Sequence, residues 1–102
     1  MIETFAIETF QFRVGDRFRM RVMSGDKLDL ELTSVRSLVD HAESQSPGTH
    51  RKPFSLSFIG PEGVRLPQGT YHFEHTELGE FDVFIVPIGL RGDQLTFEAI
   101  FT

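Results

Sequence analysis

The sequence contains no cysteine and no tryptophan, and tyrosine occurs only once. Without cysteine, disulfide bonds, thiolate metal sites and cysteine nucleophiles are all excluded. No apolar run approaches the ~18 residues of a membrane-spanning helix, and the N-terminus lacks the basic-then-apolar order of a signal peptide. We therefore expect a cytoplasmic protein with no membrane partner.

Basic residues are also in deficit, with 10 Lys and Arg against 15 Asp and Glu, which gives a net charge of −5. Such a charge repels the nucleic-acid backbone, so we expect no nucleic-acid partner. The length of 102 residues is that of one domain, and we expect a single all-β domain over residues 1–102.

Recognisable catalytic motifs are missing as well. The sequence has no Gly-x-Ser-x-Gly elbow, no Walker loop, no His-Glu-x-x-His and no Gly-x-Gly-x-x-Gly. We therefore expect a protein without enzymatic activity, with no catalytic residue and no cofactor.

The sequence is rich in short segments in which apolar and polar residues alternate with a period of two, separated by glycine- and proline-containing turns. This pattern is typical of antiparallel strands. The six segments are 17–22, 28–32, 54–58, 70–75, 81–88 and 95–101. Six short strands must close or fold over to protect their edges, which predicts a small antiparallel barrel or a compact sandwich with a phenylalanine-rich core.

The first two segments form a predicted hairpin around Ser24-Gly25-Asp26. Setting Met20 opposite Leu30 places apolar side chains on one face and puts Arg21 by Asp29 and Arg19 by Glu31 on the other. A slip by one residue would set leucines against arginines, whereas pairing Met20 with Leu32 also keeps the faces matched.

Two segments fall outside the strand pattern. The N-terminal segment favours a short helix that is capped by Thr4, ends before Gly15 and packs on the sheet. Residues 40–52 contain one apolar residue in thirteen, which predicts a long loop that is either functional or merely mobile.

Residues 81–88 are apolar on both faces of the predicted strand. Phe81, Val83 and Ile85 share the face suited to the core, and the opposite face carries three further large side chains, Phe84, Val86 and Ile88. Exposure of that second face would forfeit several kcal/mol, since each such side chain contributes ~1.5–3 kcal/mol when fully buried.

Two covers are available for this second face. One is the N-terminal segment, whose apolar residues are Ile2, Phe5, Ile7 and Phe10, and we favour it. The other is a second protein chain, since exposed apolar patches mark association sites. Pro87 cannot donate a ladder hydrogen bond, so the strand lies at an edge or ends there, which favours the interface.

Histidines and acids gather between residues 72 and 77. His72, Glu74, His75 and Glu77 offer nitrogen and oxygen ligands for a metal or small ligand. On an extended strand, however, His72 and His75 point to opposite faces, and His75 is better explained by a structural hydrogen bond at the following Leu78-Gly79 turn.

Arg17, Arg19 and Arg21 form a basic stripe on one face of the first predicted strand. Guanidinium groups can bind an anion in a planar fork, which makes the stripe a possible anion site. The alternative is cross-strand neutralisation by the acids of the second strand.

A family resemblance rests on recurring turn glycines and core aromatics. The motifs are Phe54-Ser-Leu-x-Phe58, Leu66-Pro-x-Gly-x-Tyr71, Glu74-His75 with Leu78-Gly79, Phe81-x-x-Phe84-x-x-Pro87-x-Gly89 and Phe97-Glu-Ala-x-Phe101. They resemble those of an uncharacterised family of short bacterial all-β domains. The resemblance transfers no catalytic residue, and it implies a structural or assembly role in the company of phage-tail-like proteins.

The sequence thus favours a non-enzymatic interaction or structural module. We expect it to bind a protein partner or a second copy of itself through Phe81, Phe84, Val86, Ile88 and nearby loops. The alternative is a barrel that binds a small ligand or metal through the His and Glu residues at positions 72–77.

Overall fold

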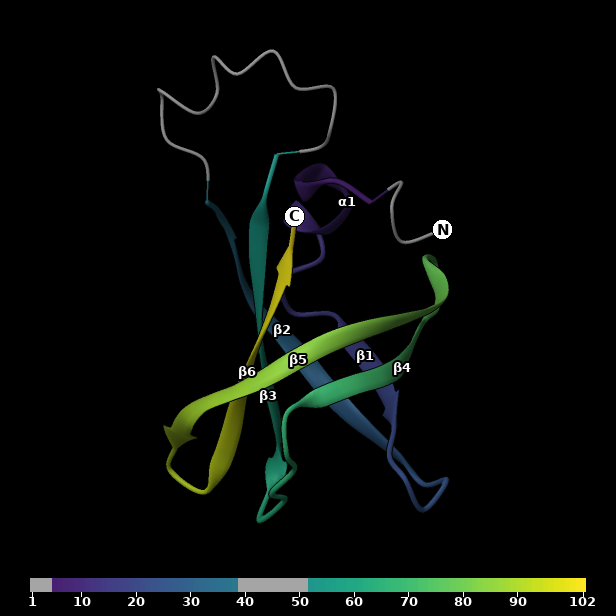
Figure 1. Cartoon of the computed structure of the whole chain (residues 1–102), viewed down its shortest axis with the longest axis vertical. Coiled ribbons are helices and arrows are strands. Elements are labelled where there is room, and N and C mark those ends of the chain that lie inside the picture. The colour runs from purple at the N-terminus through teal and green to yellow at the C-terminus, as the bar shows by residue number, and fades with distance from the viewer. Residues whose placement is uncertain (1–4, 39–51) are drawn as a thin grey trace.

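The fold is a closed antiparallel barrel with a short helix at one end (Figure 1). The computed structural model describes residues 5–38 and 52–102. The elements are α1 (Ile7–Gln11), β1 (Arg17–Arg21), β2 (Lys27–Ser37), β3 (Phe54–Glu62), β4 (Gly69–His75), β5 (Gly79–Arg91) and β6 (Gln94–Phe101). Around the barrel the strands follow the order β1-β2-β3-β6-β5-β4. The predicted all-β class is confirmed, and of the two predicted architectures the barrel is the one that forms.

The barrel is filled by the inward residues of the alternating strands, and phenylalanine dominates them. Six phenylalanines are almost completely buried: Phe10, Phe18, Phe54, Phe58, Phe73 and Phe97. Their rings pack edge to face, as between Phe18 and Phe58 with centroids 5.4 Å apart, or stacked, as between Phe54 and Phe101 at 4.8 Å. Such ring pairs add about 0.5–1.5 kcal/mol each beyond the apolar area they bury.

The β1–β2 hairpin has the predicted faces but a different register. Met20 lies opposite Leu28, and Phe18 lies opposite Leu30. The turn sets this offset of two residues, because the Val22 and Asp26 backbones close a three-residue loop that ends in Gly25 with φ +93°. Three-residue hairpin loops place a glycine at this left-handed position, and their length determines which residues face each other.

Strand β2 continues beyond the predicted segment to Ser37. The strand pairing shifts between Leu32 and Ser34, and Thr33 Oγ1 donates a hydrogen bond to the Ser57 carbonyl oxygen at 3.1 Å. This bulge changes the alternation, so that Val35 packs on the core although it is out of phase with Leu28, Leu30 and Leu32. The broken period explains why the sequence pattern ended too early.

One of the two expectations for Pro87 was that the strand ends there. Strand β5 instead continues to Arg91. It pairs with β4 up to Ile85 and with β6 from Ile85 to Arg91, with a register shift between Pro87 and Gly89. Pro87 therefore lies next to a bulge and beyond the last β4 pair, where its missing N–H interrupts no β4–β5 ladder.

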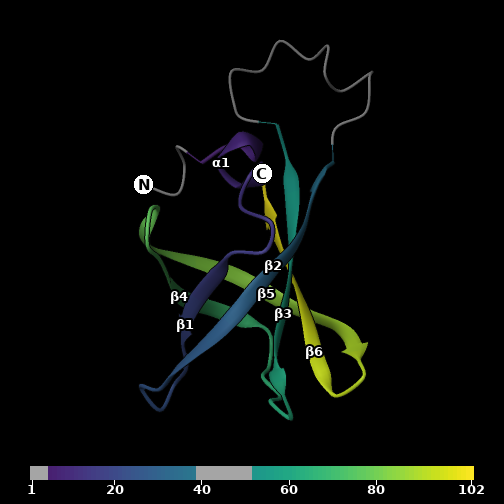
Figure 2. The same cartoon turned by 180° about the vertical axis from the view of Figure 1, so that it is seen from behind.

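The N-terminal segment closes one end of the barrel, beside the end of β6 in both views (Figure 2). The predicted short helix is confirmed as α1, but the predicted cap is wrong. The N-cap is Ala6 instead of Thr4, and the Ala6 N–H donates to Thr9 Oγ1 at 3.0 Å. Phe10 packs against Phe54 and Phe101, with ring centroids 5.9 and 5.5 Å away. Thr4 and Ile2 lie outside the described residues, as does nearly all of the predicted 40–52 loop.

The favoured cover for the second face of β5 is therefore wrong for the described part of the N-terminal segment. Phe5 and Phe10 are buried in the barrel core, and the Phe5 ring contacts inward-facing Phe81 at 5.1 Å. Phe5 and Phe10, which the sequence offered as a cover for the outer face of β5, instead fill the end of the barrel. No helix within residues 5–38 and 52–102 has the length and apolarity to cross a bilayer.

Candidate functional site

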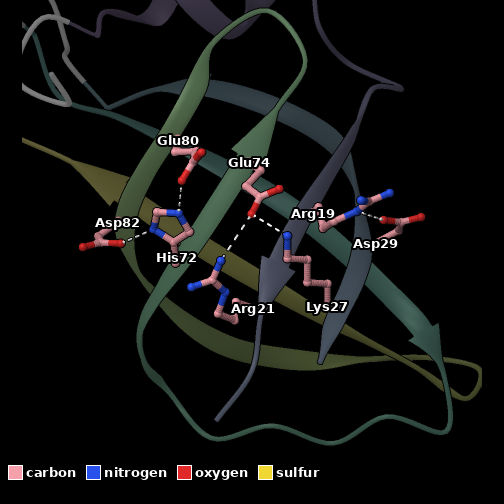
Figure 3. Close-up of polar contacts among 8 residues, drawn as sticks. All are labelled: Arg19, Arg21, Lys27, Asp29, His72, Glu74, Glu80 and Asp82. Carbon is pink, nitrogen blue, oxygen red and sulfur yellow. Dashed lines mark hydrogen bonds and ion pairs between the residues drawn. The ribbon is translucent and has the colours of Figure 1, made fainter. Parts of the chain in front are cut away.

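The outer face of β1, β2 and β4 carries charged side chains that are joined by ion pairs (Figure 3). Arg19 pairs with Asp29 at 3.6 Å. Arg21 and Lys27 face each other across the hairpin. Both form ion pairs with Glu74 on β4, at 3.7 and 2.9 Å respectively. The Lys27 hydrogen bond is the main reason why the pKa of Glu74 is held below its ordinary value.

The predicted arginine stripe is thus neutralised in part, but with other partners than expected. Arg19 takes Asp29 instead of Glu31, and Arg21 takes Glu74 instead of Asp29, because the register is offset by two residues. Within the described part of the chain, Arg17 has no ion pair. It borders a groove of about 460 Å³ that Arg19 also lines, together with three acids, Asp29, Glu74 and Glu80, so carboxylates outnumber guanidinium groups there.

His72 lies on the outer face of β4, between two carboxylates of β5 (Figure 3). Its Nδ1 is 2.8 Å from Asp82 Oδ1, and its Nε2 is 2.8 Å from Glu80 Oε1. Both contacts are hydrogen bonds only if each ring nitrogen carries a proton, which is the imidazolium form. The hydrogen bond that His72 donates to Asp82, and after it the one to Glu80, therefore raise the pKa of His72 above its ordinary value.

His75 points the other way and is buried beneath the β4–β5 turn. Its Nε2 lies 2.9 Å from Asp16 Oδ2, and its Nδ1 accepts hydrogen bonds from the backbone N–H groups of Glu77 and Leu78 at 3.0 and 3.2 Å. The ring packs on Phe18 with centroids 4.5 Å apart. Since Nδ1 must offer a lone pair to two amides, Nε2 carries the proton that is donated to Asp16.

Glu77, the last of the four residues predicted as ligands, joins this buried cluster from its exposed side. It pairs with Arg13 at 3.4 Å, and Arg13 donates in turn to the Thr9 carbonyl oxygen of α1 at 2.8 Å. The cluster thus ties the N-terminal helix to the β4–β5 turn. Its role is the structural hydrogen bonding that the sequence favoured for His75.

The four predicted ligand residues therefore fall into two separate groups on opposite sides of β4. One is His72, Glu74 and Glu80, and the other is Asp16, His75 and Glu77, each with candidate ligand atoms within 4.8 Å of one another. All four ring nitrogens already have hydrogen-bond partners. Both groups work as ion-pair and hydrogen-bond clusters as they stand, and we assign neither as a metal site.

The apolar part of the site lies further along β5. Phe84 and Ile88 are 50% and 55% exposed, Val86 is half-buried, and Ile100 of β6 is 54% exposed. Ile85 pairs with Ala99 on the inner face. Their neighbours in the antiparallel register, Phe84 and Ile100, therefore lie next to each other on the outer face. The prediction that Phe81 belongs to the interface is wrong, because Phe81 is buried among the rings of the core.

Outward-facing residues of β5 thus form a continuous series, which we call the outer β5 row: Glu80, Asp82, Phe84 and Val86, with Ile88 following in the bulge. The sequence pattern did not lead us to connect the two acids to His72. The signal was present, because pairing across the predicted Leu78-Gly79 turn sets His72 opposite Asp82. Asp16 gave no comparable signal, since its contact with His75 depends on barrel closure. The position of Ile100 beside the β5 residues depends on the β5–β6 register, which shifts between Pro87 and Gly89.

These features define a small antiparallel β-barrel with a helical plug and an outer face that is part charged and part apolar. The chain belongs to the family described as Domain of unknown function (DUF6916), which matches residues 5–101. This agrees with the expected kinship to an uncharacterised domain family. Searches of curated proteins and of solved structures find no match to the chain.

The His72 contacts predict a titration that NMR can measure residue by residue. Since folding favours protonated His72, the stabilisation from its ion pairs is complete below the unfolded pKa near 6.5 and is lost as the pH rises through the raised folded pKa. We expect Asp82→Asn to lower the pKa of His72 more than Glu80→Gln does, and Asp29→Asn, which removes an acid bound to Arg19, to leave it in place. A His72 that titrates at or below its ordinary value would contradict this geometry.

The His75 contacts predict a loss of stability. His75→Leu leaves two backbone amides and the Asp16 carboxylate without their partner, which we expect to lower the free energy of unfolding by about 1–3 kcal/mol in urea denaturation. Thr76→Ala in the same turn is the matched control, because Thr76 is exposed, and it should change stability by about 0.5 kcal/mol at most. Equal effects of the two substitutions would show that the hydrogen bonds of His75 do not hold the turn.

Proposed function

We propose that this protein is a non-enzymatic interaction module whose partner, another protein, docks on the outer β5–β6 face. The observation that carries the proposal is the exposure of Phe84, Ile88 and Ile100 on neighbouring strands whose inner faces fill the barrel. Large apolar side chains grouped on the surface of a folded protein mark association sites.

The position of this face supports the proposal further. Strand β5 runs past the end of β4, so among the described strands its residues from Val86 to Arg91 have a neighbour on the β6 side alone. Aromatic and aliphatic anchors of this kind are the residues that dominate binding energy when a partner buries them. A partner that covers Phe84 and Ile100 would thus gain apolar contacts without unfolding any part of the barrel.

The setting we propose is a multi-protein assembly, of the phage-tail-like kind that the motif resemblance to bacterial domains implies. A module of this sort needs a stable scaffold and a docking face, and no catalytic group. The alternative function, binding of a metal or small ligand, makes a different prediction: purified protein would contain a stoichiometric metal whose removal lowers the melting temperature.

The decisive experiment compares three surface variants by affinity capture from the native host, with reconstitution from purified components. Phe84→Glu and Ile100→Glu place a charge on the proposed face, whereas Phe12→Glu changes an almost fully exposed phenylalanine elsewhere. We expect one protein to be retained by the wild type and Phe12→Glu, to be lost with the other two, and to bind the purified wild type with the same dependence.

Light scattering on the same four proteins reports whether the partner is a second copy. Unchanged circular dichroism spectra would show that each variant folds. Capture of the same proteins by all variants, together with an unchanged monomer in every case, would contradict the proposed docking face.

A further inference from the structure

The outer β5 row changes character along its length. Glu80 and Asp82 are 67% and 68% exposed at their side chains, and the apolar residues Phe84 and Val86 follow on the same face. The distance along the strand from Asp82 to Val86 is about 14 Å, at ~3.4 Å per residue. A partner that lies along the row therefore meets negative charge at one end and apolar surface at the other.

In the described part of the chain, the two carboxylates form their ion pairs with His72. Arg21 and Lys27 are paired with Glu74, and Arg19 is paired with Asp29. Arg17 lines the same groove as Glu80 but forms no ion pair with a described residue. His72 itself faces Arg21 across the β1–β4 ladder, Glu74 on its own strand, and Glu80 and Asp82 on β5. When His72 is neutral, neither carboxylate keeps an ion pair with a described residue.

A second copy of the chain does not fit this row. In a two-fold symmetric dimer the row meets itself in one of two directions. The antiparallel direction sets Glu80 and Asp82 against Val86 and Phe84, which removes carboxylates from water without a partner. The parallel direction sets acids against acids, which repel each other.

We propose that the partner surface carries basic side chains next to an apolar stretch, with the basic groups over Glu80 and Asp82 and the apolar groups over Phe84, Val86 and Ile100. This inference rests on the proposed function, since it specifies the chemistry of the partner for the same face. Guanidinium groups suit the acidic end because they bind carboxylates in a planar fork.

The geometry makes this partner a competitor of the proton on His72. A basic group that pairs with Glu80 and Asp82 takes over the oxygens that hold the imidazolium, and two cations in the same place repel each other. Binding therefore strengthens as the pH rises through the pKa of His72. By linkage, the bound partner lowers the pKa of His72 and releases a proton.

The probe is a synthetic peptide of about ten residues, in which two arginines and then three valine or isoleucine residues alternate with serine, matching the spacing of the row. A second peptide carries glutamate in place of arginine. We expect the wild type to bind the arginine peptide at least about tenfold more tightly than the glutamate peptide, with an affinity that falls as salt is added.

Protein variants test which residues carry this preference. Glu80→Gln with Asp82→Asn should weaken binding of the arginine peptide by about tenfold, as expected for the loss of charge-assisted contacts, whereas Glu31→Gln, an exposed acid on β2, should leave it unchanged. His72→Gln should remove the pH dependence of binding, and NMR should show the pKa of His72 falling when the peptide binds to the wild type.

Failure of the arginine peptide to bind, or equal binding by the Gln/Asn double variant, would overturn the inference. Binding that needs Phe84 but is indifferent to the sign of the peptide charge would also overturn it, while leaving the proposed docking face intact. Loss of the docking face itself would be seen separately, in the capture experiment with Phe84→Glu and Ile100→Glu.

Discussion

The central constraint in this protein is the allocation of apolar side chains to the two faces of β5. The inner face supplies Phe81, Val83 and Ile85 to the barrel, and the ring of Phe5 packs on Phe81 from the N-terminal segment. That segment is thereby committed to the end of the barrel. The outer face of β5 keeps its apolar residues in contact with solvent as a consequence of how the core is filled.

The remaining surface follows from the register around β4. Barrel closure pairs β4 with β1, which brings Glu74 to two basic residues of the first hairpin. The β4–β5 hairpin brings His72 to two acids of β5. The next residue along, His75, turns inward and is held by Asp16 and two turn amides. Strand β4 thus carries a titratable histidine, His72, between two carboxylates on its outer face. At its C-terminal end it carries His75 in a structural hydrogen-bond cluster.

Local pattern predicted the fold class and most of the faces. Alternation located all six strands, and it set Phe81, Val83 and Ile85 on the opposite face from Phe84 as the structure has them. The predicted interface wrongly included Phe81, which is buried. It also favoured the structural role of His75 at the Leu78-Gly79 turn. These features depend on neighbours in sequence and on the two-residue period of a strand, both of which a single sequence displays.

The alternation of apolar and polar residues could not predict features that depend on barrel closure or on exact turn geometry. The three-residue loop ending in Gly25 offset the first hairpin by two residues and so changed every predicted partner of the arginines. The contacts of Asp16 with His75, and of Phe5 and Phe10 with the barrel core, join segments far apart in the chain. Alternation has no information about which distant segment fills a given space.

The most direct test of this account compares Phe81→Ala with Phe84→Ala by urea denaturation, since the two residues are three apart on one strand and face opposite sides. The account predicts a loss of about 3–5 kcal/mol for Phe81→Ala, as for a core phenylalanine, and of about 1 kcal/mol or less for Phe84→Ala. Equal losses for the two variants would mean that the outer face of β5 belongs to the core, and they would contradict its assignment as a docking surface.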